Sequence, residues 1–588
     1  MPPLAKIAAI AATVAGFALY AASFEPFGVA EFAYVFAALF YVAARRGGLS
    51  SKAWLAVSAA GSWCAWCAIL AWLRFVYPPA GAVFLAGLSA VLGLFMLAWM
   101  WMLFKFAPRD GSPFASRMAR ILFLASAWVV LEWVRSFLFT GFPWMLLAHS
   151  QWLRPAVIQP AEIGGPYIIS FVLIFFNMGL GEFVCRTWAW HKSRVSGGAR
   201  ASGAGRFSPE FYIGAGMVMA CLFMYISNMP RVGAMRREFR AGMVQTDFAG
   251  ILNWSSELGM RNLDTLRRLT MALKKARVDV VLWPESSTPP QWPVIGTPGV
   301  REWVEAAARD AGAPILMGNG AYYPGPGGGW EGSTRYNAAF FVSEKTGLCE
   351  KFYAKQKLVP FGEYKPAWCF FLDSGVVPVG GMTPGAGPVV LEGEIAGRKW
   401  KIAPVICYED VFPQIGRAAA NAGADMLFVC TNDSWYGREG GAWQHAAHSA
   451  FMAVSTRRPV LRSSINGLSG VFDQYGRLVP AFALRNAGGG IFDGSGEARE
   501  VLDLTDPEGM PVSESTLRRA RGGPLADDSG SIYFRGAGYA DVPTYSNFDG
   551  VQTFYMRFGD WFPAACAAYI LAAVFLRKKI LTNPVKCG

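Results

Sequence analysis

Val405-Ile406-Cys407-Tyr408-Glu409-Asp410 places a cysteine where a run of apolar residues ends. Two other stretches have the same character. Leu282-Trp283-Pro284-Glu285 supplies a carboxylate, and segment 355–363, Lys-Gln-Lys-Leu-Val-Pro-Phe-Gly-Glu, supplies the ammonium of Lys355. A thiol nucleophile needs a base to take its proton and a positive or N–H group to stabilise the oxyanion that it generates. We therefore select Glu285, Lys355 and Cys407 as candidate catalytic residues.

Each of these three residues has an ordinary structural interpretation when it is taken alone. A cysteine that ends an apolar strand is usually a packed core residue, Glu285 could cap a helix, and Lys355 could be a solvated surface lysine. The combination favours chemistry. Trp-Pro-Glu follows one apolar stretch, Cys-Tyr-Glu follows another, and Lys355 precedes the Glu of Pro-Phe-Gly-Glu by eight residues.

The surrounding segments predict an α/β fold. Nearly all-apolar strands are expected at 239–244, 279–283, 314–317, 337–342, 402–407, 426–430 and 459–463. Helices are expected at 255–277, 300–311, 413–422 and 442–455. Apolar strands that alternate with helices are typical of sheets covered by helices. In such folds the reactive groups gather where strands end and loops begin.

Composition indicates that this α/β block belongs to a membrane protein. The chain has 588 residues, 53% of them hydrophobic, and its mean hydropathy of +0.29 is too high for an ordinary soluble enzyme. Apolar runs that could span a bilayer lie at 5–23, 29–44, 54–73, 79–104, 119–138, 165–185, 211–228 and 561–576. We expect the first run to be retained as a span and not to be cleaved as a signal peptide.

The net charge of +13 lies outside the α/β block. Residues 229–560 contain 34 Lys+Arg and 34 Asp+Glu, so the block is neutral and no nucleic-acid partner is expected. In the loops between the expected spans, 17 basic residues fall on one side of the membrane and three on the other. Because basic loops stay on the cytoplasmic side, both termini are expected in the cytoplasm and the block outside.

These observations divide the chain into four expected parts. Residues 1–228 form a membrane domain with seven transmembrane helices, and 229–485 form the outer catalytic domain. Residues 486–556 are an extension rich in Gly, Asp and Arg, and 557–588 hold the last transmembrane helix and a tail.

The cysteines and histidines predict neither a disulfide framework nor a metal site. Whether Cys349 and Cys369 pair is left open by the sequence. His445 and His448 have a spacing that could begin a metal site, but no third ligand has suitable spacing, so no metal is expected.

Further motifs resemble those of a bacterial enzyme family. They are Glu25-Pro26-Phe27-Gly28, the Leu-Glu-Trp-Val-Arg of 131–135, the Phe-Thr-Gly-Phe-Pro-Trp of 139–144, the Ala-Glu-Ile-Gly-Gly-Pro-Tyr of 161–167, the Asn-Asp-Ser-Trp-Tyr-Gly of 432–437 and the Ala-Trp-Gln-His of 442–445. With the three stretches above, they are similar to motifs of the apolipoprotein N-acyltransferases, members of the nitrilase superfamily with a Glu-Lys-Cys triad. The resemblance covers about residues 1–480 and the last span. It implies a bacterial inner-membrane protein with eight spans and a periplasmic nitrilase-like α-β-β-α sandwich.

The resemblance also implies a two-step acyl transfer without a cofactor. Cys407, deprotonated by Glu285, would take a fatty acyl chain from a membrane phospholipid. The resulting thioester would acylate the α-amino group of the N-terminal diacylglyceryl-cysteine of an apolipoprotein. Lys355 would stabilise the oxyanion of both steps, and Glu363 would orient Lys355 or the amine.

Five other residues are expected to support the site. Tyr408 and Glu409 would shape the pocket. Asn337 fits an amide contact to the catalytic residues, or else an ordinary hydrogen bond at a strand end. Trp254 and Trp435 either anchor the protein at the lipid headgroups or form a lid or wall for the lipid chain, and both interpretations stay open.

Two other functions fit parts of the pattern. A membrane-tethered nitrilase-type amidase would use the same triad with water in place of the amine, but hydrolysis of a soluble amide needs no preceding spans. A transporter with a degenerate outer binding module would be favoured by acids within the membrane. Glu132 and Glu162 are the candidates, and both fall near span ends.

Overall fold

The computed structural model describes residues 3–77, 80–195, 207–248, 255–325, 332–367, 381–486, 488–496, 523–544 and 551–575. The chain divides into two compact units, Met1–Asn228 together with Phe558–Gly588, and Met229–Arg557. We call them the membrane unit and the outer unit, and describe each by itself.

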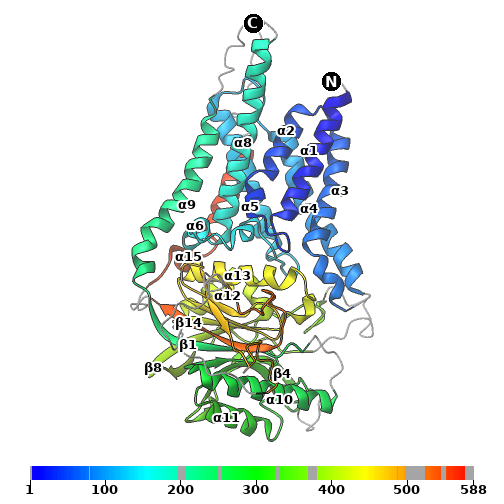
Figure 1. Cartoon of the computed structure of the whole chain (residues 1–588). Helices are drawn as coiled ribbons and strands as arrows, with labels where there is room; N and C mark the ends of the chain where they lie inside the picture. The colour runs from blue at the N-terminus through cyan, green and yellow to red at the C-terminus, as the bar shows by residue number, and fades with distance from the viewer. Residues whose placement is uncertain are drawn as a thin grey trace. The chain divides into compact units, whose positions relative to one another are not determined.

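The membrane unit is made of helices (Figure 1). The longer ones are α1 (Pro3–Ala22), α2 (Phe36–Arg46), α3 (Ser51–Ile69), α4 (Ala80–Phe106), α5 (Phe114–Arg135), α8 (Pro166–Val195), α9 (Pro209–Gly233, which runs into the outer unit) and α16 (Trp561–Phe575). Short helices are η1 (Ala30–Tyr34), η2 (Ala71–Phe75), η3 (Leu147–Gln151), α6 (Pro155–Ile158) and α7 (Ala161–Gly164).

Five of the helices in the described ranges are long and apolar enough to cross a membrane, namely α1, α4, α5, α8 and α9. The other three expected spans coincide with shorter or less apolar helices. The 11 residues of α2 follow the separate helix η1, α3 has 19 residues but lower hydropathy, and 15 residues of α16 are described. The expected total of eight spans therefore stays a prediction.

Small residues bring the first helices of the membrane unit into close contact. A Cβ atom on Gly16 of α1 would lie 2.4 Å from the ring of Phe40, and one on Gly61 of α3 would lie 2.2 Å from the ring of Phe17. Lipid chains are as apolar as these side chains, so close van der Waals packing is what holds such helices together.

The outer unit contains two sheets. The larger has the strand order β13-β14-β1-β2-β3-β4-β5, and β6 also pairs with β4. Its strands are β1 (Arg236–Gln245), β2 (Val280–Leu282), β3 (Ile315–Tyr323), β4 (Thr334–Ser343), β5 (Gly347–Leu348), β6 (Tyr353–Ala354), β13 (Ala481–Ala483) and β14 (Gly536–Thr544). β1, β2 and β3 run parallel.

The smaller sheet has the order β12-β11-β10-β9-β8-β7. Its strands are β7 (Leu391–Ile395), β8 (Arg398–Ile406), β9 (Met426–Thr431), β10 (Val460–Ser464), β11 (Gly470–Phe472) and β12 (Leu478–Val479). β8, β9 and β10 run parallel, so their carboxyl ends share one edge of the sheet.

The two sheets pack face to face between helices, which confirms the α-β-β-α sandwich. Side chains of both sheets share one core, in which Val280 and Leu282 of β2 join residues such as Phe428 of β9. Val281 points to the opposite face and packs with α10 (Ser256–Leu273) and α11 (Val300–Ala311). Helices α12 (Pro413–Asn421) and α13 (Gly441–Thr456) contact the smaller sheet. Figure 1 shows the two helix pairs on opposite sides of the strands.

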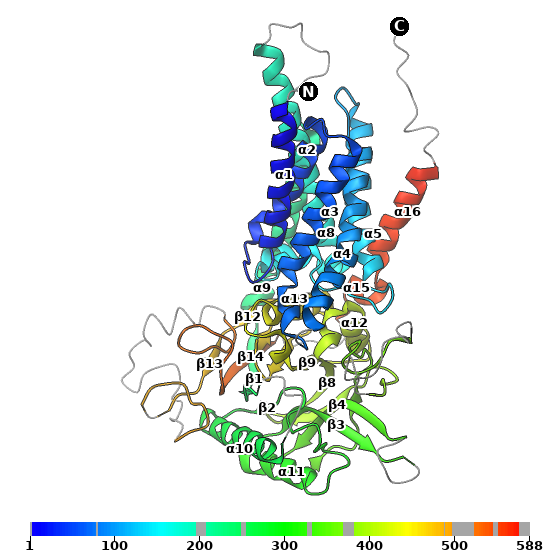
Figure 2. The same cartoon turned by 90° about the vertical axis from the view of Figure 1, so that its right-hand side faces the viewer.

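The expected extension contributes to the larger sheet. Strand β14 pairs antiparallel with both β1 and β13, side by side in Figure 2. The sequence did not predict this strand, because Gly536-Ala537-Gly538-Tyr539-Ala540 is built mainly from small residues. The remaining short helices of the outer unit are η4 (Lys274–Ala276), η6 (Cys407–Val411), η7 (Asp433–Tyr436) and α15 (Phe554–Phe558).

Candidate functional site

Glu285 lies just after the carboxyl end of β2, and its side chain is buried. The neighbouring strand β3 carries Gly318 at the point of closest approach. A Cβ atom there would lie 2.7 Å from the Cα of Glu285 and 2.9 Å from the Sγ of Cys430. A glycine is therefore required for the segment that carries Glu285 to sit against the two sheets.

Lys355 is brought beside Glu285 by the pairing of β6 with β4. Its backbone N–H donates to the carbonyl oxygen of Asn337 at 2.8 Å. Its Nζ lies 3.0 Å from Oε1 of Glu363 and 3.5 Å from Oε1 of Glu285. The Asn337 amide donates to the same two oxygens, at 2.7 Å to Glu285 and 2.8 Å to Glu363. Two carboxylates therefore share one ammonium and one amide.

The charge of Lys355 is stabilised by this arrangement. The lysine is 1% exposed, and burial by itself disfavours an ammonium. The carboxylates of Glu363 and Glu285 outweigh burial and raise the pKa of Lys355 above its usual value. Lys355 therefore stays protonated and is suited to stabilising negative charge, not to transferring a proton.

Cys407 stands at the sharp turn from β8 into η6. Its φ is +51°, a left-handed conformation that is uncommon outside glycine and that concentrates at functional sites. Burial, and then the negative charge of Glu285, raise the pKa of the thiol above its usual value, while Lys355 opposes the rise. Cys407 thus lies within electrostatic range of both other triad candidates, and its resting thiol needs a base.

Glu409 ties the lysine loop to the cysteine turn. Its carboxylate accepts from the Tyr353 hydroxyl at 2.8 Å, from the backbone N–H groups of Gln356 and Lys357 at 2.6 and 3.0 Å, and from that of Ile406 at 2.8 Å. Because those groups flank Lys355 and Cys407, the buried carboxylate sets the position of both segments.

Of the three aromatic candidates, Tyr408 and Trp435 lie within the described residues. The ring of Tyr408 is buried and meets Phe412 edge-on, with ring centroids 5.1 Å apart. Trp435 is partly buried in η7. Trp254 and Cys369 lie outside the described residues, so the two interpretations of the tryptophans and the question of a Cys349–Cys369 pair stay open.

A group of buried polar side chains near Cys407 could not be predicted from the sequence. We call Asp410, Asp433, His445 and Arg462 the buried ion cluster. All four have side chains that are almost fully buried, and ion pairs join Arg462 to both aspartates. Asp433 and His445 fall within two of the quoted motifs, but their spacing gave no sign of the pairing. Arg462 lies inside an apolar strand, where a charge is itself a signal of a buried partner.

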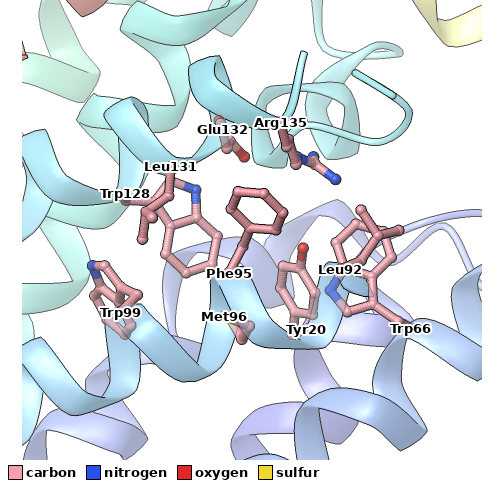
Figure 3. A pocket seen from close by; sticks show the side chains of 10 residues that line it. All are labelled: Tyr20, Trp66, Leu92, Phe95, Met96, Trp99, Trp128, Leu131, Glu132 and Arg135. Carbon is pink, nitrogen blue, oxygen red and sulfur yellow. The ribbon is translucent and has the colours of Figure 1, made fainter. Parts of the chain in front are cut away.

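Glu132, one of the two acids named for a transporter, has a structural partner. Glu132 and Arg135 line a pocket with aromatic and apolar side chains (Figure 3). Glu132 accepts from the backbone N–H of Leu147 at 2.7 Å, and Arg135 donates to the carbonyl oxygen of Met145 at 2.9 Å. Both charges therefore hold the loop that follows α5, which weakens the transporter interpretation.

Two family models match the chain. The model described as apolipoprotein N-acyltransferase N-terminal domain matches residues 16–179, and the model described as carbon-nitrogen hydrolase matches residues 240–487.

Similar proteins carry a consistent name. An apolipoprotein N-acyltransferase of Brucella melitensis is 30% identical over 413 residues, which cover 68% of this chain and 71% of that protein. One from Pseudomonas aeruginosa is 28% identical over 419 residues, covering 68% and 72%. A solved amidase from Nesterenkonia sp. is 18% identical with a TM-score of 0.31, and covers 53% of this chain and 92% of its own. At that TM-score the likeness supports no conclusion about an amidase activity.

Proposed function

The chain belongs to the apolipoprotein N-acyltransferase family, and from this premise we propose that it transfers a fatty acyl chain to the α-amino group of the N-terminal diacylglyceryl-cysteine of apolipoproteins. The observation that carries the proposal is the shared contact of Lys355 with Glu285 and Glu363, within electrostatic range of Cys407. This site thus combines a base (Glu285), an oxyanion donor (Lys355) and a nucleophile (Cys407).

In the first step the Glu285 carboxylate takes the proton of the Cys407 thiol. The thiolate attacks the ester carbonyl carbon of a phospholipid, and a tetrahedral oxyanion forms. The C–S bond is made in this attack, and the C–O ester bond breaks when the intermediate collapses. The lysophospholipid leaves with the proton that Glu285 returns, and a thioacyl-cysteine remains.

In the second step the amine of the lipoprotein attacks the thioester. Glu285 accepts a proton from the amine as the C–N bond forms. The C–S bond then breaks and the thiolate of Cys407 is released, to be reprotonated for the next cycle. A thiolate is a better leaving group than an alkoxide, which makes the thioester a suitable acyl donor to an amine.

Lys355 acts through its charge in both steps. The contacts with Glu285 and Glu363 keep it protonated, so that it can hold the oxyanion. Glu363 positions Lys355, since it is the nearer of the two carboxylates and also accepts from the backbone N–H of Val359 at 2.8 Å. Asn337 and Glu409 hold the reacting groups in register, and Tyr408 lines the turn.

The protein acts in the bacterial inner membrane. We assign the outer unit to the periplasm and both termini to the cytoplasm, supported by the 17 basic residues on one side against three on the other. We assign membrane phospholipid as the acyl donor, supported by the apolar helices of the membrane unit.

The test uses purified enzyme, phospholipid with an isotope-labelled acyl chain, and a synthetic diacylglyceryl-cysteine peptide. The proposal expects the label on the peptide amine, with the Cys407→Ala variant as the inactive control. Label that is released only as free fatty acid would identify a hydrolase and overturn the proposal. If the peptide gains no label from phospholipid but gains it from another labelled acyl ester, the assignment of phospholipid as the donor is wrong.

A further inference from the structure

We propose that His445 is a positioning residue for the nucleophile, and that it acts as an imidazolium whose two N–H groups donate to the carbonyl oxygen of Cys407 and to the carboxylate of Asp433. The inference rests on the proposed role of Cys407.

The first support is the geometry of the imidazole ring. Nε2 of His445 lies 3.1 Å from the carbonyl oxygen of Cys407, and Nδ1 lies 2.8 Å from Oδ1 of Asp433. A carbonyl oxygen and an ionised carboxylate can only accept hydrogen bonds, so each ring nitrogen must carry a proton to bind its partner. Although burial opposes it, Arg462 and His445 hold the pKa of Asp433 below its usual value, which keeps that carboxylate ionised.

The second support is the charge of the buried ion cluster. Arg462 donates to Oδ2 of Asp410 at 2.6 Å and to Oδ2 of Asp433 at 3.0 Å. Burial raises the pKa of Asp410, and the charge of Arg462 opposes the rise. When both carboxylates are ionised, a neutral histidine leaves the cluster with two carboxylates against one guanidinium, and so with one uncompensated buried negative charge. An imidazolium makes the cluster neutral, and buried charges are retained when they are paired.

One contact favours the neutral ring. Nη2 of Arg462 lies 2.9 Å from Nδ1 of His445, a distance at which a neutral Nδ1 could accept. That arrangement would turn the lone pairs of Nδ1 and of Asp433 Oδ1 toward each other at 2.8 Å, and would leave the charge unbalanced. The imidazolium costs Arg462 the bond to Nδ1, but Nη2 keeps Oδ2 of Asp433 as an acceptor.

Titratable groups face the imidazole from each element around it. They are Cys407 and Asp410 from η6, Asp433 and Tyr436 from η7, and Arg462 from β10. The ring of Tyr436 meets the imidazole edge-on, with centroids 5.8 Å apart.

The arrangement serves the nucleophile in two ways. The hydrogen bond to the carbonyl oxygen of Cys407 stabilises the left-handed backbone conformation of this residue, which is unfavourable for any residue other than glycine. The positive charge offsets the negative charge of Asp433, which disfavours the thiolate. His445 touches neither acyl group nor amine, and therefore acts through Cys407.

The first experiment separates the charge from the hydrogen bond. His445→Gln keeps a donor for the carbonyl and loses the charge, whereas His445→Ala loses both. We expect the midpoint of the pH profile for iodoacetamide alkylation of Cys407 to move up by about one unit in His445→Gln. Thioester formation with phospholipid should fall on the order of 10²-fold in His445→Ala at every pH, and be rescued at high pH in His445→Gln. His448→Gln, on the same helix, is the control and should leave both measurements unchanged.

The second experiment needs no variant of His445 to fold. The chain has only four histidines, so selective ¹⁵N-histidine labelling gives signals from four side chains. The signals of His445 are identified by substituting each of the other three histidines in turn. The proposal expects two N–H signals from His445 at neutral pH. A neutral tautomer, or an alkylation profile of His445→Gln that coincides with the wild type, would overturn the imidazolium. Wild-type thioester formation in His445→Ala would overturn the positioning role. Neither NMR nor alkylation involves substrate, so both are independent of the proposed function.

Discussion

The side-chain amide of Asn337 donates a hydrogen bond of 2.7 Å to Oε1 of Glu285. The same amide also donates to Glu363. Together the two bonds fix the orientation of the Glu285 carboxylate, and so the lone pairs with which it can accept the proton of Cys407. Asn337→Ala should therefore slow thioester formation on the order of 10²-fold, because a misplaced base costs about that factor. The rate is measured in a single turnover with phospholipid alone. Asn421→Ala, whose amide donates to the carbonyl oxygen of Met556, is the control. A wild-type rate in Asn337→Ala would refute the positioning of Glu285.

The mutual influence of Glu285 and Cys407 predicts a specific pH effect. Burial and the charge of Glu285 raise the pKa of the thiol above its usual value, so removal of that charge should lower it. We expect Glu285→Gln to shift the alkylation profile of Cys407 to lower pH, while acyl transfer falls by about 10²–10⁴-fold for want of a base. The variant should therefore contain more thiolate at a given pH and yet transfer acyl groups more slowly. An alkylation profile that moves to higher pH would contradict the account.

Gly318 predicts a steric effect close to the base. A Cβ at this position would lie 2.7 Å from the Cα of Glu285, and overpacking of this kind typically costs about 1–3 kcal/mol. Gly318→Ala should lower the midpoint of thermal unfolding and reduce acyl transfer. Gly387→Ala is the control, because nothing lies within 4 Å of its added methyl. Equal behaviour of the two variants would show that the close approach does not matter.

The orientation in the membrane can be tested directly. The charge asymmetry predicts that a cysteine introduced at Asp493 reacts with a membrane-impermeant maleimide added to cells with a permeabilised outer membrane. A cysteine at Lys105 should react only after the inner membrane is disrupted. Labelling of position 493 only after disruption would place the outer unit in the cytoplasm.

Much of the fold could be predicted from the sequence, since the central strands are continuous apolar runs. The expected strand at 426–430 matches β9 within one residue, and the expected helix at 300–311 matches α11. The expected strand at 402–407 ends within one residue of β8, which begins four residues earlier, at Arg398. Strand β14 could not be predicted, because its small residues take strand form only by pairing with β1. Five expected spans form long, apolar helices, whereas α2 is too short and α3 is less apolar.

The candidate site divides in the same way. Glu285 and Cys407 could be selected because each follows an apolar strand, where chemistry gathers. Lys355 could be selected because it precedes the Glu of Pro-Phe-Gly-Glu by eight residues. Their roles stay predictions, although the structure brings Glu285 and Lys355 into contact. The pairing of Asp433 with His445 and Arg462 could not be predicted, since it depends on the turn after β9, helix α13 and strand β10 meeting in space.

The most direct test of the central claim is mass spectrometry of Cys407 after the enzyme meets phospholipid in the absence of any lipoprotein. The account predicts a fatty acyl adduct on the peptide that contains Cys407, which disappears when an amine acceptor is added. Lys355→Met should form the adduct on the order of 10²–10³-fold more slowly, because it loses the oxyanion charge. An adduct on another residue, or transfer at the wild-type rate by Cys407→Ala, would contradict the account.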